Sequence, residues 1–169
     1  MILKRKNSVA KFEKVPVAEF AETLDKDRYI KFYTENFKLP QRATPGSCGY
    51  DIYSPVTFTL KPGESITLPT FLRCKIKNGY FLMIVPRSGL GFKYRVRLDN
   101  TVGIIDSDYY NADNYGHIKA KITNEGSKEM IIEEGTAFCQ GIFLKYYLTE
   151  DDADYEKKIR RGGFGSTTK

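Results

Sequence analysis

The spacing of hydrophobic residues changes near Pro40 and divides the chain into unlike parts. In the segment PVAEFAETL, residues 16–24, apolar positions recur at i, i+3, i+4 and i+7, the spacing of one face of an α-helix. Pro16 suits the first turn of such a helix. We therefore predict a short amphipathic helix of about ten residues that begins at Pro16. Residues 29–37 fit either a helix or a strand, and we interpret residues 1–38 as an N-terminal extension.

After Pro40, short apolar runs alternate with segments rich in Gly, Pro, Asn and Asp. Each run is typical of a β-strand. The predicted strands lie at residues 50–53, 56–60, 64–76, 80–85, 94–98, 101–105, 117–123, 129–132 and 138–148. Because we expect no helix between these strands, the pattern favours an all-β sandwich or barrel. We predict this β-domain over residues 39–148 and a C-terminal arm over residues 149–169.

The composition agrees with one globular domain. The 169 residues are 41% hydrophobic and 28% charged, which is enough to bury a core without a second domain. The sequence has no apolar run near the roughly 18 residues that span a bilayer, so we expect no membrane partner. Three widely spaced cysteines without a CxxC pair predict neither a disulfide framework nor a zinc site, and they favour the reducing cytoplasm.

The net charge of +6 is concentrated near the two ends of the chain. It could attract nucleic acid, bind a small polyphosphate ligand, or simply keep the surface hydrated. We do not expect nucleic acid to be the main partner. The single histidine, His117, cannot form a metal site alone.

Residues 100–110, NTVGIIDSDYY, concentrate the candidate chemistry. The β-branched run that begins at Thr101 favours extended backbone, and a glycine within it often marks a close backbone approach. Such a strand could form a pocket floor whose N–H and C=O groups read the edge of a planar ligand. Asp106 is the candidate general base, and Tyr109 offers a flat face to a sugar or a ring. The alternative is a strand that ends in an Asp-rich turn.

Four other segments carry polar or glycine-rich chemistry. PRSGLG, residues 86–91, offers Arg, Ser and backbone N–H groups to a phosphate, although it lacks the Walker pattern. GGFGST, residues 162–167, could close as a lid, with its Phe stacked on a base. Asp51 could hold a hydrated cation, and Gln140 could bind a phosphate oxygen or a water. PRSGLG could instead be a surface turn, and GGFGST a solubilising tail. Asp51 could instead cap a turn, and Gln140 could be a satisfied amide in a sheet.

Taken in order, these five segments closely resemble the five motifs of the trimeric dUTPases, the deoxyuridine triphosphate nucleotidohydrolases. The resemblance runs from about Leu39 to the C-terminus, and PRSGLG, NTVGIIDSDYY and GGFGST are its most specific parts. It implies a jelly-roll subunit, a homotrimer with three active sites at subunit interfaces, and a mobile C-terminal arm that closes over the nucleotide. It also implies a role in nucleotide metabolism that keeps uracil out of DNA.

The implied reaction is Mg²⁺-assisted attack of water on the α-phosphorus of dUTP, giving dUMP and pyrophosphate. By motif matching, Asp106 would orient and deprotonate the water, with Arg87 and Gln140 as further catalytic residues. Tyr109 would lie beneath the deoxyribose and leave no room for a 2′-hydroxyl. The residues implied to contact uracil are Asn100, Gly103, Ile104, Ile105 and Phe164, and those implied to contact the phosphates are Arg87, Ser88, Gly89 and Gln140. Asp51 would contact Mg²⁺ through water, and Gly165 and Ser166 would contact the nucleotide under the closed arm.

Two segments depart from the family motifs. The family commonly has RGxGGFG, whereas this chain has Arg160 and Arg161 directly before the glycines, so either arginine could reach the γ-phosphate. Residues Tyr110–Tyr115 stand where the family usually has a single residue. We expect this longer turn to reshape the rim of the pocket. Lys119, just beyond it, could present its backbone or its ammonium group to the base or sugar.

Three other functions stand as alternatives. The dCTP deaminases share this fold and resemble the chain at residues 116–118, but they carry a Glu shortly afterwards, where this chain has Lys121. A binding protein could keep the fold without turnover, although Asp106, Arg87 and Tyr109 are all present. A regulatory protein partner could also use the basic N-terminal extension alongside catalysis. The third alternative is a nucleic-acid-binding module.

Overall fold

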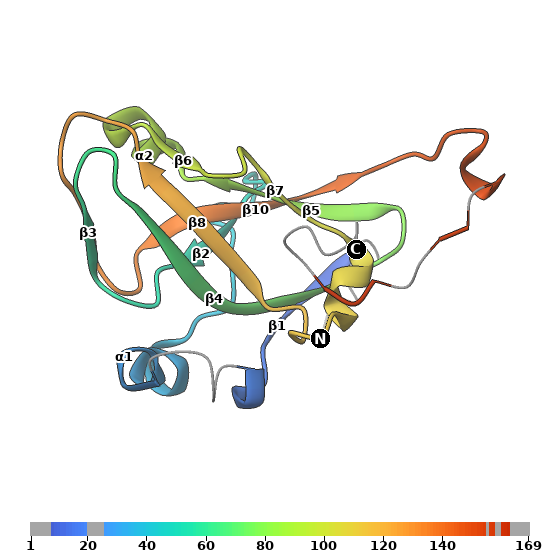
Figure 1. The fold of residues 1–169 in the computed structure, drawn as a ribbon, viewed down its shortest axis with the longest axis horizontal. Coiled ribbons are helices and arrows are strands. Elements are labelled where there is room, and N and C mark those ends of the chain that lie inside the picture. Colours follow the sequence, from blue (N-terminus) through green and yellow to red (C-terminus); the bar gives the residue numbers. More distant parts are fainter. Residues whose placement is uncertain (1–7, 20–25, 155, 158–159, 163–169) are drawn as a thin grey trace.

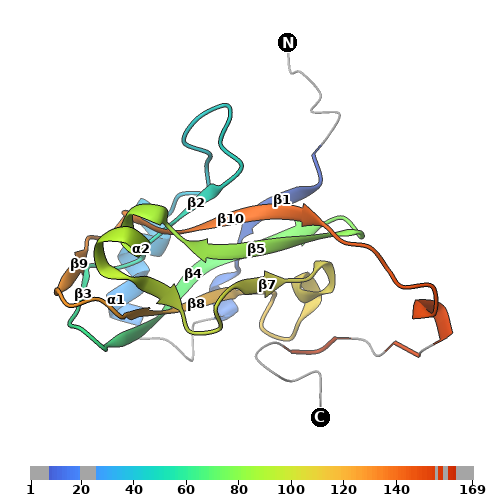
Figure 2. The same cartoon turned by 90° about the horizontal axis from the view of Figure 1, so that it is seen from above.

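The computed structural model describes residues 8–19, 26–154, 156–157 and 160–162. Its strands form two four-stranded sheets and a two-stranded ribbon, arranged as a β-sandwich (Figures 1 and 2). The first sheet has the order β1 (Ala10–Lys14), β4 (Ser65–Ile76), β8 (Ile118–Asn124), β6 (Val96–Leu98). The second sheet has the order β2 (Tyr50–Tyr53), β10 (Ala137–Lys145), β5 (Tyr80–Pro86), β7 (Gly103–Ile105). The ribbon pairs β3 (Phe58–Leu60) with β9 (Met130–Ile132).

Every strand predicted from the sequence is present, and the predicted all-β class is confirmed. β8 illustrates why the prediction works. Ile118, Ala120 and Ile122 are buried, and Lys119 and Lys121 alternate with them along the strand, as the period of two in a half-buried strand requires. The sheets do not close into one hydrogen-bonded barrel within the described residues. Of the two architectures left open, a sandwich is therefore the better description.

Two short helical segments interrupt the β-domain, where we expected none. α2 (Ser88–Tyr94) follows β5 directly, and a 3₁₀ turn (Ser107–Asn111) follows β7. The glycines of PRSGLG concealed α2 because glycine disfavours helix. Arg95 ends this helix with a left-handed φ of 52° and donates its N–H to the Gly91 carbonyl at 2.9 Å. No helix in the described part of the chain is long and apolar enough to cross a membrane.

The N-terminal extension contributes a strand to the sandwich. β1 pairs with β4 along its whole length, although the sequence indicated no regular element there. Of the helix predicted at residues 16–24, a 3₁₀ turn over Val17–Glu19 is described, and residues 20–24 lie outside the described residues. α1 (Lys26–Lys31) continues as a π-helical segment (Phe32–Asn36), so the helical alternative for this region is the correct one.

β4 contains a bulge at which its pairing with β8 shifts register. Phe71 lies in this bulge with a φ of 56° and is completely buried, an uncommon backbone conformation for a bulky side chain. Its N–H donates to Nε2 of His117 at 3.1 Å, and the rings of Tyr29 and Tyr33 pack edge-on against its ring. The bulge therefore joins the aromatic side chains of the N-terminal extension to the segment that leads into β8.

Candidate active site

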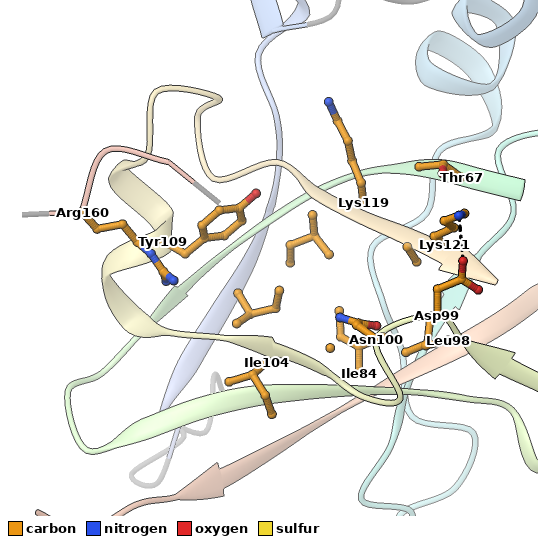
Figure 3. A pocket seen from close by; sticks show the side chains of 14 residues that line it. Thr67, Ile84, Leu98, Asp99, Asn100, Ile104, Tyr109, Lys119, Lys121 and Arg160 are labelled. Atoms are coloured by element: carbon orange, nitrogen blue, oxygen red, sulfur yellow. Dashed lines mark ion pairs between the residues drawn. The ribbon is translucent and has the colours of Figure 1, made fainter. Parts of the chain in front are cut away.

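A cavity of about 620 Å³ lies between β7 and β8 (Figure 3). Its lining residues are Thr67, Ile84, Leu98, Asp99, Asn100, Gly103, Ile104, Ile105, Tyr109, Ile118, Lys119, Ala120, Lys121 and Arg160. The walls are mostly aliphatic, and a few polar groups converge on them, as is usual for a small-molecule site. The site residues predicted from the sequence that line this cavity are Asn100, Gly103, Ile104, Ile105, Tyr109, Lys119 and Arg160.

The floor of the cavity is β7, which lies at the edge of its sheet. Only one side of its backbone pairs with β5, and an edge strand keeps N–H and C=O groups available on its other side. A Cβ atom on Gly103 would lie 3.1 Å from Cβ of Ile84. This distance is tighter than an ordinary contact, so glycine allows β7 to approach β5 closely. The geometry agrees with the close backbone approach that we inferred for this glycine.

A tight turn between β6 and β7 presents Asn100 at the rim of the cavity (Figure 3). Thr101 has a left-handed φ of 66° and donates its N–H to the Leu98 carbonyl at 2.9 Å. Val102 donates its N–H to the Asn100 carbonyl at 2.7 Å. Because the backbone of this turn is bonded to itself, the exposed amide of Asn100 is held beside the cavity and can bind a ligand.

Tyr109 forms one end wall of the cavity, and its side chain is buried. Its hydroxyl donates to the His117 carbonyl at 2.9 Å and accepts a bond from Nδ2 of Asn114 at 2.8 Å. Burial raises the pKa of Tyr109, although the bond from Asn114 and the charge of Arg160 oppose this effect. The phenol is therefore neutral and fixed at its outer end. Asn114 was not among the site residues predicted from the sequence.

Asp106 is bound by the C-terminal arm. Nη1 of Arg160 lies 2.9 Å from Oδ2 of Asp106 and 3.1 Å from Oδ1 of Asp108, and its guanidinium stands 5.5 Å from the centre of the Tyr109 ring. The side chain of Arg160 is only 18% exposed. Arg161 is exposed, and its carbonyl accepts the N–H of Asp113 at 2.8 Å. Of the two arginines left open by the sequence, Arg160 is the one whose side chain reaches the cavity.

A second group of predicted site residues lies where β2, β10 and β5 meet. Nη1 of Arg87 is 2.7 Å from Oδ2 of Asp51. Gln140 stands opposite Asp51 in the β2–β10 register, and its Nε2 is 3.5 Å from the Pro86 carbonyl. A Cβ atom on Gly49 would fall 2.1 Å from Oε1 of Gln140, so the glycine of the GYD sequence makes room for this amide.

The predicted site residues thus fall into two groups on one chain. Ser88 and Gly89 are exposed in the first turn of α2, directly after Arg87. Neither they nor Asp51, Arg87 and Gln140 are among the described residues that line the cavity. Phe164, Gly165 and Ser166 lie outside the described residues. Within a single chain, Arg87, Ser88, Gly89 and Gln140 do not meet the groups predicted to bind the nucleoside, whereas Arg160 does. Asp106 does not line the cavity itself and is joined to it through Arg160.

A buried network behind the cavity was not predicted. Nδ1 of His117 lies 2.9 Å from Oε1 of Glu19, and Nε2 accepts the N–H of Phe71. Because Nε2 accepts, the ring proton is on Nδ1 and is donated to the carboxylate. Oε1 of Glu19 also lies 3.5 Å from Nζ of Lys119. The ammonium group of Lys119 is therefore engaged by the N-terminal extension, and its aliphatic stem lines the cavity.

His117 should make the stability of the protein depend on pH. Burial lowers the pKa of His117 to about 4. The hydrogen bond that His117 donates to Glu19 and the negative charge of Glu19 raise this pKa, whereas the charge of Lys119 lowers it further. A histidine with a depressed pKa stabilises the folded state above its unfolded pKa of about 6.5, and this contribution is lost as the pH falls towards its folded pKa. We expect the free energy of unfolding to drop by about 2 kcal/mol between pH 7 and pH 5.

Urea denaturation at these two pH values measures the effect, and His117→Gln is the matched variant. It keeps an acceptor for the Phe71 N–H but cannot titrate, and the chain has no other histidine. Glu13, whose pKa is lowered to about 2 by Tyr110, Lys11 and Arg73, loses its contribution only below about pH 4.5. An equal drop in the variant would show that another group carries the effect.

Comparison with known proteins gives one consistent result. Residues 35–168 match the family model described as dUTPase. The deoxyuridine 5′-triphosphate nucleotidohydrolase of Lactococcus lactis is 38% identical over 138 residues, covering 81% of this chain and 92% of the relative. The protein of the same name from Finegoldia magna is 39% identical over 137 residues, covering 78% and 92%.

Solved structures agree with the sequence comparison. The crystal structure of dUTPase from Streptococcus mutans matches with a TM-score of 0.62 and 28% identity, covering 82% of this chain and 98% of that chain. A mutant dUTPase from phage phi11 of Staphylococcus aureus, described as revealing the coordination of a structural Mg(II) ion, matches with a TM-score of 0.62. Its identity is 20%, and it covers 85% of this chain and 94% of its own length. This second likeness concerns the fold alone.

Proposed function

Because the chain belongs to the dUTPase family of deoxyuridine triphosphate nucleotidohydrolases, we propose that it hydrolyses dUTP to dUMP and pyrophosphate by attack of water on the α-phosphorus. The observation that supports this most directly is the cavity over the edge strand β7, with Asn100 at its rim and Tyr109 at its end. Asp106 follows the last residue of that strand. A slot floored by backbone and closed by an aromatic ring suits a planar base joined to a sugar.

The base would lie along β7 and beside Asn100. Uracil presents an N3–H donor between two carbonyl acceptors, and the backbone of an edge strand offers both complementary kinds of group. Cytosine has a donor amine where uracil has O4, so the same slot would leave buried polar groups unpaired against it. A site built to hydrogen-bond its substrate in this way rejects a mismatched analogue by several orders of magnitude.

Asp106 would hold and deprotonate the attacking water. In the structure, its carboxylate is paired with Arg160. A triphosphate carries more negative charge than the two carboxylates that share this arginine, so a bound nucleotide would draw the guanidinium towards its phosphates. Asp106 would then be available to the water, and general-base catalysis of this kind contributes roughly 10²–10⁴-fold to a rate.

The phosphates would be held by Arg87, Ser88, Gly89 and Gln140, which lie apart from the cavity of their own chain. We therefore propose a homotrimer in which this phosphate-binding group of one chain faces the cavity of another. Closed symmetric assemblies are the usual form of homo-oligomers. Sedimentation should then give three times the 19.4 kDa mass of one chain.

Asp51 and the substrate would hold Mg²⁺. The described ranges contain no cluster of three or more His, Cys, Asp or Glu side chains suited to a metal. Mg²⁺ in nucleotide sites typically keeps several waters and is bound by one or two carboxylates and by substrate phosphates, so a single carboxylate fits this mode. Bound there, the ion would offset charge that develops on the phosphates. Asp51, paired with Arg87 at 2.7 Å, would orient its waters.

A role in nucleotide metabolism follows from this activity, since removal of dUTP keeps uracil out of DNA. The thiols of Cys48, Cys74 and Cys139 are all free, which suits a reducing compartment such as the cytoplasm. A regulatory protein partner that uses the N-terminal extension stays a prediction.

A substrate panel tests the proposed reaction. With Mg²⁺ present, the purified protein should release pyrophosphate from dUTP, and kcat/KM for dCTP should be lower by about a thousandfold or more. The values of kcat/KM for dTTP and UTP should also be lower than that for dUTP. Chelation of divalent ions should slow turnover of dUTP. Release of ammonia from dCTP would instead support the deaminase alternative, and DNA binding that is unaffected by dUTP would support the nucleic-acid alternative.

A further inference from the structure

The longer turn after Tyr109 places an amide directly behind the phenol. Nδ2 of Asn114 lies 2.8 Å from the Tyr109 hydroxyl and 3.2 Å from the His117 carbonyl, and its Oδ1 accepts the N–H of Gly116 at 3.2 Å. The His117 carbonyl can only accept a hydrogen bond, so the atom of the amide that faces it must be the donor nitrogen. This requirement fixes the orientation of the Asn114 side chain.

The hydroxyl of Tyr109 is consequently held from two sides. Its single proton is donated to the His117 carbonyl at 2.9 Å, and its oxygen accepts a proton from Asn114. The carbonyl does not move easily, because the His117 ring is buried, bonded to Glu19 and to the Phe71 N–H, and stacked on the Phe71 ring. The outer end of the phenol is therefore anchored to a rigid part of the core.

We infer that Asn114 is a positioning residue that fixes the ring of Tyr109 and thereby sharpens discrimination between deoxyribose and ribose. The inference rests on the proposed function, in which this ring lies beneath the sugar. A ring excludes a 2′-hydroxyl only if it cannot retreat, and a displacement of about 1 Å at a site of this kind can have a large effect on rate. Asn114 supplies the second hydrogen bond that holds the ring. It belongs to the longer turn, which stands where the family usually has a single residue.

The test is the ratio of kcat/KM for dUTP to kcat/KM for UTP, measured for the wild type and for Asn114→Ala. We expect the ratio to fall by roughly three- to tenfold, the effect of losing one hydrogen bond. Both constants come from the same preparation, so a smaller folded fraction cancels from the ratio. A loss of stability alone would therefore leave the ratio unchanged.

A double-mutant cycle with Tyr109→Phe separates positioning from a general disturbance of the turn. If Asn114 acts through the hydroxyl, its removal should change the ratio much less when the hydroxyl is already absent. Asn111→Ala is the matched control, since Asn111 is an exposed residue of the same turn, and it should keep the wild-type ratio.

These measurements distinguish a failure of the proposed function from a failure of the role inferred for Asn114. A wild-type protein that does not hydrolyse dUTP would overturn the proposed function. A wild type that selects dUTP, together with an unchanged ratio in Asn114→Ala, would overturn the inference alone. Equal losses of selectivity with and without the Tyr109 hydroxyl would also overturn it, because Asn114 would then act by another route.

Discussion

Asp106→Asn should lower kcat for dUTP hydrolysis by about 10²–10⁴-fold, the usual worth of a general base. The substitution keeps the size of the side chain and its ability to accept a bond from Arg160, but an amide cannot take a proton from water. Nucleotide binding should persist, because the base, sugar and phosphate contacts are untouched. Pyrophosphate release measures the first effect, and calorimetry with a non-hydrolysable dUTP analogue measures the second.

Asp108→Asn is the matched control for this result. Asp108 shares the same guanidinium, at 3.1 Å from Nη1 of Arg160, and its side chain is 59% exposed. If the loss in Asp106→Asn came only from a weakened ion pair, the two variants would be impaired equally. We expect Asp108→Asn to change kcat by no more than a few-fold. A nearly active Asp106→Asn would show that another group activates the water.

Strands such as β6, β8 and β9 were predictable because their burial repeats every two residues. β1 was not, because the segment AKFEK becomes a strand through its partner. Its register with β4 sets Phe12 opposite Cys74, and Phe12 packs in addition against the rings of Tyr50 and Phe143. Contacts between residues this distant in sequence leave no local signal, so tertiary context decides the structure of such a segment.

The candidate site was predictable where its chemistry is local. The edge strand and the Tyr109 ring lie within residues 100–110, and the structure brings both to one cavity. Asp106 follows the strand and is joined to the cavity through its ion pair with Arg160. Glu19 and Asn114 were missed because both depend on contacts with His117, Glu19 with its ring and Asn114 with its carbonyl. The family resemblance implied sites shared between subunits, but the sequence alone does not say which of the predicted residues lie together within one chain.

The N-terminal extension and the longer turn, which both depart from the shortest family pattern, are joined to each other. The Tyr110 hydroxyl donates to Oε2 of Glu13 at 2.6 Å, and Arg73 contacts both residues, with its guanidinium 4.1 Å from the centre of the Tyr110 ring. Glu13 belongs to β1, and Glu19 follows it at the back of the cavity. The extension thus supports the turn at one point and, through His117, the cavity wall formed by Tyr109 at another.

Mixing two inactive variants should restore activity if the two groups of site residues come from different chains. Asp106→Asn lacks the water-activating carboxylate, and Arg87→Ala lacks a phosphate-binding side chain from the other group. In a trimer assembled at random from equal amounts of the two variants, about half of the cavities keep Asp106, and about half of the chains that face them keep Arg87. About a quarter of the sites therefore have both residues. Pyrophosphate release should therefore rise from near zero to about a quarter of the wild-type rate after denaturation and refolding together.

The same variants refolded separately and then mixed form the control, and they should stay inactive over the time of the assay. If each chain instead built a complete site from its own residues, every site in the mixture would lack either Asp106 or Arg87, and joint refolding would restore nothing. The ion pair between Arg87 and Asp51 at 2.7 Å lies outside the cavity between β7 and β8 of the same chain. Recovery of activity would therefore require one chain to lend its phosphate-binding group to the cavity of its neighbour.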